Sequence, residues 1–286
     1  MDAAHLDAAH VDAAHVDPAH LDARLVDAYL RRLGTGRPPR PTADALAELH
    51  LNHLLAVPFE NLSVQLGERI VLEERRLVEK VVEEGRGGFC YELNGAFGSL
   101  LAALGFEVTF LAARVFGAPG RLGIPYDHMA LRVGTADGGT WLADVGFGAH
   151  SHLPLRWADR GEQRDPGGVF RIDEAEGTDA GDLDVVRNGS PQYRLEVRPR
   201  ALGDFVAGAW WHSTSPESHF TRSLVCSRVT GDGGRITLSG RRLKVTAPEG
   251  DSVERELVTD EEVLGVYRER FGIVLDQVPE VRAATA

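Results

Sequence analysis

The spacing of apolar residues changes near Phe106, and this change constrains the fold more than any other feature of the sequence. Before that residue, apolar side chains recur three or four positions apart, which is the period of one helix face. They are Leu93, Phe97, Leu100, Leu101 and Leu104. From residue 106 to 110 apolar and polar residues alternate instead, which is the period of a β-strand. A helical region followed by a β region predicts an α+β fold.

The chain of 286 residues is long enough for two or three small domains. Its residue patterns divide it into four segments. We expect a low-complexity tail over 1–24, a helical region over 25–105, a strand-rich region over 106–206 and an α/β region over 207–286. Within the third segment, the turn 135–139 separates two expected strands, 128–133 and 141–145. Near the end, Thr259 and Glu262 have the spacing of a capping box for a last helix.

The first segment repeats five residues of the type Asp-Ala-Ala-His followed by leucine or valine. A period of five advances about 140° per unit on a helix, so the apolar positions never share a face. We therefore expect a disordered extension with no catalytic role. The alternative is weak binding of a divalent metal by its histidines and aspartates, in a protein that acts through this tail.

Composition narrows the possible partners and compartment. A formal net charge of −12 disfavours nucleic acid as the main partner. No run of about eighteen apolar residues exists, so no membrane span is expected. Two distant cysteines provide no disulfide framework, and the first residues lack the basic start of a signal peptide. We expect a cytoplasmic protein.

One of the two cysteines has the setting of a nucleophile. Cys90 follows Gly87 and Gly88, which allow a tight turn, and the helical pattern begins directly after it. A thiol in the first turn of a helix faces free amide groups and the positive end of the helix dipole, which favour the thiolate. Cys226 lies in an apolar strand pattern and is interpreted as a small core residue.

A cysteine nucleophile needs a base, and the base needs an acceptor that orients it. His128 opens one expected strand and Asp144 lies near the end of the next. Pairing centred on Ala136 would place the two residues nearly opposite each other, about 5 Å apart at Cβ if they share a face. A register shift of one residue would put them on opposite faces.

His50 and His53 lie three residues apart on an expected helix that Thr42 or Asp44 could cap. A metal-binding pair is conceivable, but two partly exposed helix histidines are the favoured interpretation.

Four short motifs, in this order along the chain, resemble those of the arylamine N-acetyltransferases. Pro58-Phe59-Glu60-Asn61-Leu62 is similar to their PFEN block, and the run Arg86 to Asn94 is similar to their active-site cysteine signature. Asp144-Val145-Gly146-Phe147-Gly148 resembles the block around their triad aspartate. The run Ser213 to Ser218 resembles their S-T-x-P-x-S segment.

The resemblance implies a catalytic triad of Cys90, His128 and Asp144. It implies a helical bundle, a central antiparallel β-barrel and an α/β lid around a cysteine-protease-like core. Acetyl-coenzyme A would acylate the cysteine, and an arylamine, hydrazine or N-hydroxyarylamine would then accept the acetyl group, with no metal or prosthetic group.

The resemblance also implies roles outside the triad. Phe147 and Gly148 would belong to the substrate-binding pocket. Glu60 and Arg86 would form a buried supporting ion pair.

Two other enzymatic functions use the same residue types. A related amide synthase would release or cyclise a carrier-bound polyketide chain with the same triad. A cysteine hydrolase shares the Cys-His-Asp logic, but the PFEN and lid motifs disfavour it.

Overall fold

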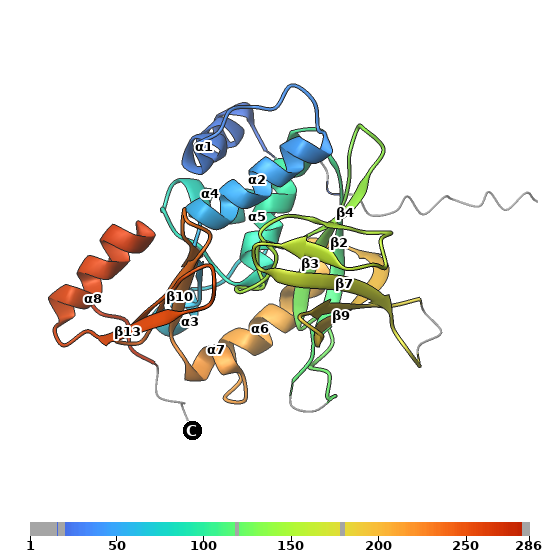
Figure 1. The fold of residues 1–286 in the computed structure, drawn as a ribbon. Helices are drawn as coiled ribbons and strands as arrows, with labels where there is room; N and C mark the ends of the chain where they lie inside the picture. Colours follow the sequence, from blue (N-terminus) through green and yellow to red (C-terminus); the bar gives the residue numbers. More distant parts are fainter. Residues whose placement is uncertain (1–15, 17–20, 118–119, 178–180, 282–286) are drawn as a thin grey trace, which may run out of the picture.

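The computed structural model describes residue 16 and residues 21–117, 120–177 and 181–281. Its helices come first and its strands follow, as the change of periodicity predicts, in a large antiparallel sheet and then a smaller sheet with helices. The protein has an α+β fold in three parts, an N-terminal helical bundle, a central β-barrel and a C-terminal α/β lid (Figure 1).

The helical bundle forms around one almost completely buried helix, α5 (Cys90–Ala103). It packs on α4 (Glu74–Val82) and α1 (Ala23–Leu33), and α1 packs on α2 (Ala43–Ala56). A short helix, α3 (Leu62–Leu66), follows α2 along the chain. The other side of α5 contacts β2 and β3 of the large sheet. The start of α5 is therefore held between the bundle and the sheet.

The large sheet has eight antiparallel strands in the order β5-β4-β3-β2-β9-β8-β7-β6 and curls into a nearly closed barrel. Its strands are β2 (Glu107–Val115), β3 (His128–Gly134), β4 (Thr140–Ala143), β5 (Leu155–Arg156), β6 (Gln163–Asp165), β7 (Gly168–Glu174), β8 (Leu183–Arg187) and β9 (Ser190–Arg200). Alternate residues of β3 pack on different cores, as a pleated strand requires. Met129 and Leu131 pack against the helices, whereas Ala130 faces the core inside the barrel.

The smaller sheet has the order β1-β10-β11-β12-β13. Its strands are β1 (Phe59–Glu60), β10 (Val225–Val229), β11 (Arg235–Ser239), β12 (Arg242–Thr246) and β13 (Ser252–Glu256). One face packs on α8 (Asp260–Val266) and the π-helical turn η3 (Tyr267–Phe271), and Cys226 is buried in this core. The 3-10 turn η2 (Leu202–Phe205), α6 (Val206–Thr214) and α7 (His219–Arg222) link the two sheets. Thr259 and Glu262 cap α8 as the sequence predicts.

Two features differ from the expected segments. Strand β1 lies within the expected helical region but pairs with β10, so the bundle and the lid share a sheet. Most of the expected tail lies outside the described residues. Val16, however, is buried, and its amide donates to the carbonyl of Val108 at 3.1 Å. Helix α1 begins at Ala23, capped by the Asp22 side chain, because an aspartate there can accept the amide of Leu25.

Among the helices of the described ranges, none has the length and apolar character to cross a membrane.

Candidate active site

Cys90 is the first residue of α5 and is almost completely buried. Phe89 precedes the helix in extended conformation, and its amide donates to the Glu92 carboxylate at 3.2 Å. The turn requires a glycine at position 87, because a Cβ there would lie 1.8 Å from the carbonyl oxygen of Pro58. The thiol therefore lies at the end of α5 where the backbone amides of the first turn are free of partners within the helix.

His128 and Asp144 form a buried pair, with 2.8 Å between Nε2 of the ring and Oδ2 of the carboxylate. The hairpin register differs by two residues from the pairing centred on Ala136. Leu131 pairs with Ala143, which puts Asp144 level with Ala130 just beyond the end of β4. A shift of two preserves the face, so the two side chains meet diagonally across the strands.

The pair is charged. Burial lowers the pKa of His128, but the charge and hydrogen bond of Asp144, with a smaller contribution from Cys90, outweigh it and raise that pKa to about 10. Burial raises the pKa of Asp144, but His128 and then other polar neighbours bring it well below its usual range. The Asp144 bond occupies Nε2, so Nδ1 is the ring nitrogen free for a thiol.

Asn94, one helical turn after Cys90, orients the carboxylate. Its amide nitrogen donates to Oδ1 of Asp144 at 2.9 Å and to the carbonyl of Met129 at 2.6 Å. Its amide oxygen accepts the backbone N–H of Val145 at 3.0 Å. One side chain on α5 thus contacts both β3 and the loop that follows β4.

Gly146 allows the loop after Asp144 to lie against α5. A Cβ at this position would be 2.7 Å from Cα of Cys90, which is far inside van der Waals contact. The backbone N–H of Gly146 donates to Oδ1 of Asp144 at 3.0 Å.

The expectation of partly exposed histidines on α2 is wrong, because both side chains are completely buried. His50 donates from Nδ1 to the carbonyl of His152 at 2.9 Å and accepts at Nε2 the amide of Asp144 at 3.2 Å. Burial lowers the pKa of His50, which keeps Nε2 free to accept. His53 lies 2.9 Å from the hydroxyl of Tyr29. His50 therefore belongs to the site, and the local helix pattern gave no signal of it.

Aromatic rings surround the imidazole of His128. Phe147 and Tyr193 have ring centroids 5.1 and 5.0 Å from it, and they lie 5.0 Å from each other. His150 stacks on Tyr193 at 5.4 Å. Tyr193 and His150 escaped sequence reasoning, because in a strand and a loop they resemble ordinary core and turn residues.

A second histidine–carboxylate pair lies next to the first in sequence. His212 on α6 has Nε2 at 3.0 Å from Oδ1 of Asp127, the residue before His128. Tyr126, one residue earlier, has a positive φ of 59°, and its carbonyl accepts the hydroxyl of Tyr91 at 2.6 Å. Helices α5 and α6 thus both hold the segment that enters β3.

Glu60 and Arg86 meet in the interior, with 3.0 Å between Oε1 and Nε. Arg86 also reaches Glu68 at 3.3 Å, and beside it Lys80 lies 2.5 Å from Glu92. Burial raises the pKa of Glu60, but Arg86 and Lys80 more than offset this and lower it. The network fixes the chain on both sides of the Cys90 turn.

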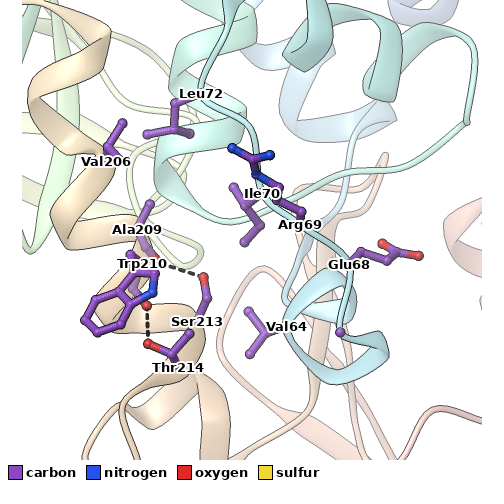
Figure 2. A pocket seen from close by; sticks show the side chains of 11 residues that line it. Val64, Glu68, Arg69, Ile70, Leu72, Val206, Ala209, Trp210, Ser213 and Thr214 are labelled. Atoms are coloured by element: carbon purple, nitrogen blue, oxygen red, sulfur yellow. Dashed lines mark hydrogen bonds between the residues drawn. The ribbon is translucent and has the colours of Figure 1, made fainter.

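A groove of about 320 Å³ lies between the loop 67–72 and α6, and none of the three predicted triad residues lines it (Figure 2). Its walls are mostly apolar, and Trp210 is exposed at its edge. The hydroxyls of Ser213 and Thr214 donate to carbonyls of their own helix, at 2.5 and 2.7 Å. These hydroxyls already have partners within α6 and do not distinguish the groove as a polar binding site.

Within the described ranges, no three His, Cys, Asp or Glu side chains are grouped so that they could hold a metal ion. Both cysteines are free thiols.

Comparisons with known proteins agree over most of the chain. A model of the N-acetyltransferase family matches residues 42–280. The arylamine N-acetyltransferase / N-hydroxyarylamine O-acetyltransferase of Salmonella typhimurium is 34% identical over 253 residues, covering 88% of this chain and 89% of that protein. The arylamine N-acetyltransferase of Escherichia coli is 33% identical over 251 residues, covering 87% of this chain and 88% of its own.

Solved structures give the same result. The Salmonella typhimurium arylamine N-acetyltransferase superposes with a TM-score of 0.81 at 32% identity, over 93% of this chain and 96% of that chain. The Mycobacterium marinum arylamine N-acetyltransferase in complex with CoA has a TM-score of 0.77 at 34% identity, over 87% and 92% of the two chains.

Proposed function

The chain belongs to the arylamine N-acetyltransferase family of acyltransferases, and from that premise we propose that it moves an acetyl group from acetyl-coenzyme A to an arylamine, a hydrazine or an N-hydroxyarylamine. The proposed cycle is ping-pong, with Cys90 as the acetylated residue. The observation that carries the proposal is the charged His128–Asp144 pair beside a cysteine at a helix N-terminus.

In the first half-reaction, the Cys90 thiolate attacks the thioester carbonyl and the C–S bond to coenzyme A breaks. The departing coenzyme A thiolate takes a proton from the His128 imidazolium, which becomes neutral. Asp144 stabilises the imidazolium and fixes the ring so that Nδ1 faces the thiol.

In the second half-reaction, the amine nitrogen attacks the acetyl-cysteine carbonyl and the bond to Sγ breaks. Neutral His128 accepts the proton that the amine loses, which restores the imidazolium and the thiolate. Over the full cycle His128 gives one proton to coenzyme A and takes one from the amine, so the enzyme returns to its starting protonation state.

Further roles in the proposal follow the site's geometry. Phe147 and Gly148 line the acceptor pocket, because the Phe147 ring lies against His128. The Glu60–Arg86 pair supports the turn that presents the cysteine. Coenzyme A is a co-substrate, and the chemistry requires no metal or prosthetic group. Two free thiols favour action in a reducing cytoplasm.

Intact mass spectrometry after mixing with acetyl-coenzyme A tests the proposal. We expect one acetyl increment, mapped to Cys90 and discharged by an arylamine. Cys90→Ala should prevent labelling, whereas the matched variant Cys226→Ala should retain it, because Cys226 is buried in a different core. Labelling of the Cys90→Ala protein would refute the assignment. A wild-type protein that stays unlabelled would refute acetyl-coenzyme A as donor and favour a carrier-bound acyl group.

A further inference from the structure

One side chain on α2, that of His50, bonds to both ends of the loop that carries Asp144. The loop runs over 144–152, between the end of β4 and the start of β5. At its first residue, the backbone N–H of Asp144 donates to Nε2 of His50 at 3.2 Å. At its last residue, the carbonyl of His152 accepts from Nδ1 of His50 at 2.9 Å. A single imidazole thus closes the loop.

These two bonds fix the protonation state of the ring. A carbonyl oxygen carries no proton, so Nδ1 of His50 must carry one. The amide of Asp144 supplies the proton of its own bond, so Nε2 must carry none. His50 can therefore hold both ends of the loop only as the neutral Nδ1–H tautomer. A proton added at Nε2 would replace the acceptor by a second donor and leave two N–H groups facing each other.

The ring has little freedom to move away from such a clash. The side chain of His50 is completely buried, and it packs edge-on against Phe97 of α5 with 6.0 Å between the ring centroids. Its backbone lies within α2, between Ala43 and Ala56, and is held by the hydrogen bonds of that helix. Loss of either bond would leave a buried polar group without a partner.

The groups around His50 keep the ring neutral at neutral pH. Burial is the largest influence and lowers the pKa of His50, and the bond to His152 and the charges of Asp144 and Asp165 only partly oppose it. Three nearby histidines repel a charge on this ring, and they are His53, His150 and His152. Acidification below the lowered pKa would place a proton on Nε2, the atom that accepts from Asp144.

The main chain at Asp144 decides how its carboxylate meets His128. Oδ2 of Asp144 lies 2.8 Å from Nε2 of His128, and Asn94 holds Oδ1. Those contacts orient the carboxylate, whereas His50 fixes the backbone from which the carboxylate extends. A displaced backbone would lengthen the contact with His128 and weaken the charge that sustains the imidazolium.

We propose that His50 is a positioning residue, which as a neutral imidazole clamps the 144–152 loop so that Asp144 meets His128, and which releases the Asp144 end when it gains a proton. This inference rests on the proposed function, because it names a residue that acts through Asp144 on the same reaction. The clamp itself belongs to the loop and can be measured without turnover.

Two conservative substitutions separate the two bonds. The side-chain amide of glutamine reaches the place of Nε2, and that of asparagine reaches the place of Nδ1. His50→Gln can therefore keep the bond to Asp144, and His50→Asn can keep only the bond to His152. For acetyl transfer to an arylamine, we expect His50→Asn to lower kcat about tenfold, the effect of one lost buried hydrogen bond, and His50→Gln to lower it less than about threefold. The KM for acetyl-coenzyme A should stay within about twofold in both variants.

His53→Asn is the matched control. His53 is equally buried on the same helix, but it bonds to the hydroxyl of Tyr29 and not to the loop. This substitution should destabilise the fold and leave kcat unchanged. Urea unfolding of all three variants separates a loss of stability from a loss of rate.

Two NMR measurements report the clamp apart from activity. The pKa of the His128 imidazole, about 10 in the wild type, should fall in His50→Asn and stay in His50→Gln. On acidification, the backbone amide signal of Asp144 should shift together with the titration of the His50 ring in the wild type. It should not show this shift in His50→Gln, because glutamine takes up no proton.

Three outcomes would overturn the clamp. Equal losses of kcat in His50→Gln and His50→Asn would mean that the loop requires the shape of the ring and not the bond to Asp144. An unchanged His128 titration in His50→Asn would refute a role through Asp144. The same Asp144 shift in the wild type and in His50→Gln would refute release by protonation. If Cys90 is not acetylated, the proposed function fails, and the two NMR measurements still decide whether His50 clamps the loop.

Discussion

The charge on one imidazole sets the chemistry proposed for this site. His128 is buried, and burial alone would keep it neutral at physiological pH. Asp144 reverses that preference, so the resting pair is an imidazolium and a carboxylate. The acid needed by the first half-reaction is therefore present before the substrate binds.

Replacing Asp144 by asparagine removes the charge and leaves the shape. We expect the pKa of His128 to fall from about 10 to below 6.5, because burial then dominates, and the transfer rate to fall about 10²- to 10⁴-fold. NMR titration of labelled imidazole and steady-state kinetics measure the two effects. An unchanged titration with an unchanged rate would contradict the assigned role of Asp144.

The same substitution has a predicted pH dependence for stability. The folded-state pKa of His128 lies above its ordinary value of 6.5, so the stabilisation by its charged form is complete below pH 6.5 and is lost as the pH rises to about 10. In urea unfolding, the difference in free energy of unfolding between wild type and Asp144→Asn should be largest at about pH 6 and smaller at about pH 10. A difference that grows with pH would reverse the assigned charges.

Sequence reasoning predicts Cys90, His128 and Asp144 as site residues because each has a local signal, a glycine turn or a strand end. It missed His50, whose two hydrogen bonds reach residues far along the chain. No periodicity on α2 distinguishes a histidine that meets Asp144 from one that meets solvent. Partners of this kind depend on how the elements pack, which one helix pattern does not contain.

Among the elements, the contact between α5 and the 144–148 loop depends on the absence of a side chain. Gly146→Ala should push the loop away from Cys90 and cost about 1–3 kcal/mol of unfolding free energy, with loss of transfer activity. Gly265→Ala on α8 is the control, because a Cβ there meets nothing within 4 Å and alanine favours a helix. Equal stability and activity of the two variants would show that the loop tolerates displacement.

His212 on the lid helix α6 contacts Asp127, the residue directly before β3. Because this contact is largely shielded from solvent, we expect a coupling free energy of about 1–3 kcal/mol between the two side chains. A double-mutant cycle with Asp127→Asn and His212→Gln, followed by urea unfolding, measures it. Additive effects of the two substitutions would mean that the contact between the two side chains does not stabilise the fold.

For the molecule as a whole, β1 makes the bundle and the lid one unit. We expect a single unfolding transition, seen alike by far-UV circular dichroism and by tryptophan fluorescence, since Trp141 lies in the barrel and Trp210 on the lid helix. Arg86→Met should lower the free energy of unfolding by about 3–5 kcal/mol, because it leaves Glu60 buried without its partner. Both signals should report the same loss. Separate transitions would contradict the shared sheet as a source of cooperativity.

At this scale the change of periodicity near Phe106 predicts that a strand-rich region follows a helical one, which the fold confirms. It could not predict β1, since two residues show no period, nor the two-residue difference in the β3–β4 register, since both registers bury the same face. Both features depend on pairing between distant segments.

The pairing of β1 also orders events during synthesis. The amide of Glu60 donates to the carbonyl of Gly88 in the cysteine turn, and Glu60 pairs with Cys226 near the end of the chain. When Cys90 has just been synthesised, neither His128 nor β10, the strand that pairs with β1, has yet been made. We therefore expect the arrangement around Cys90 to be complete only after β10, in the last third of the chain, has been synthesised.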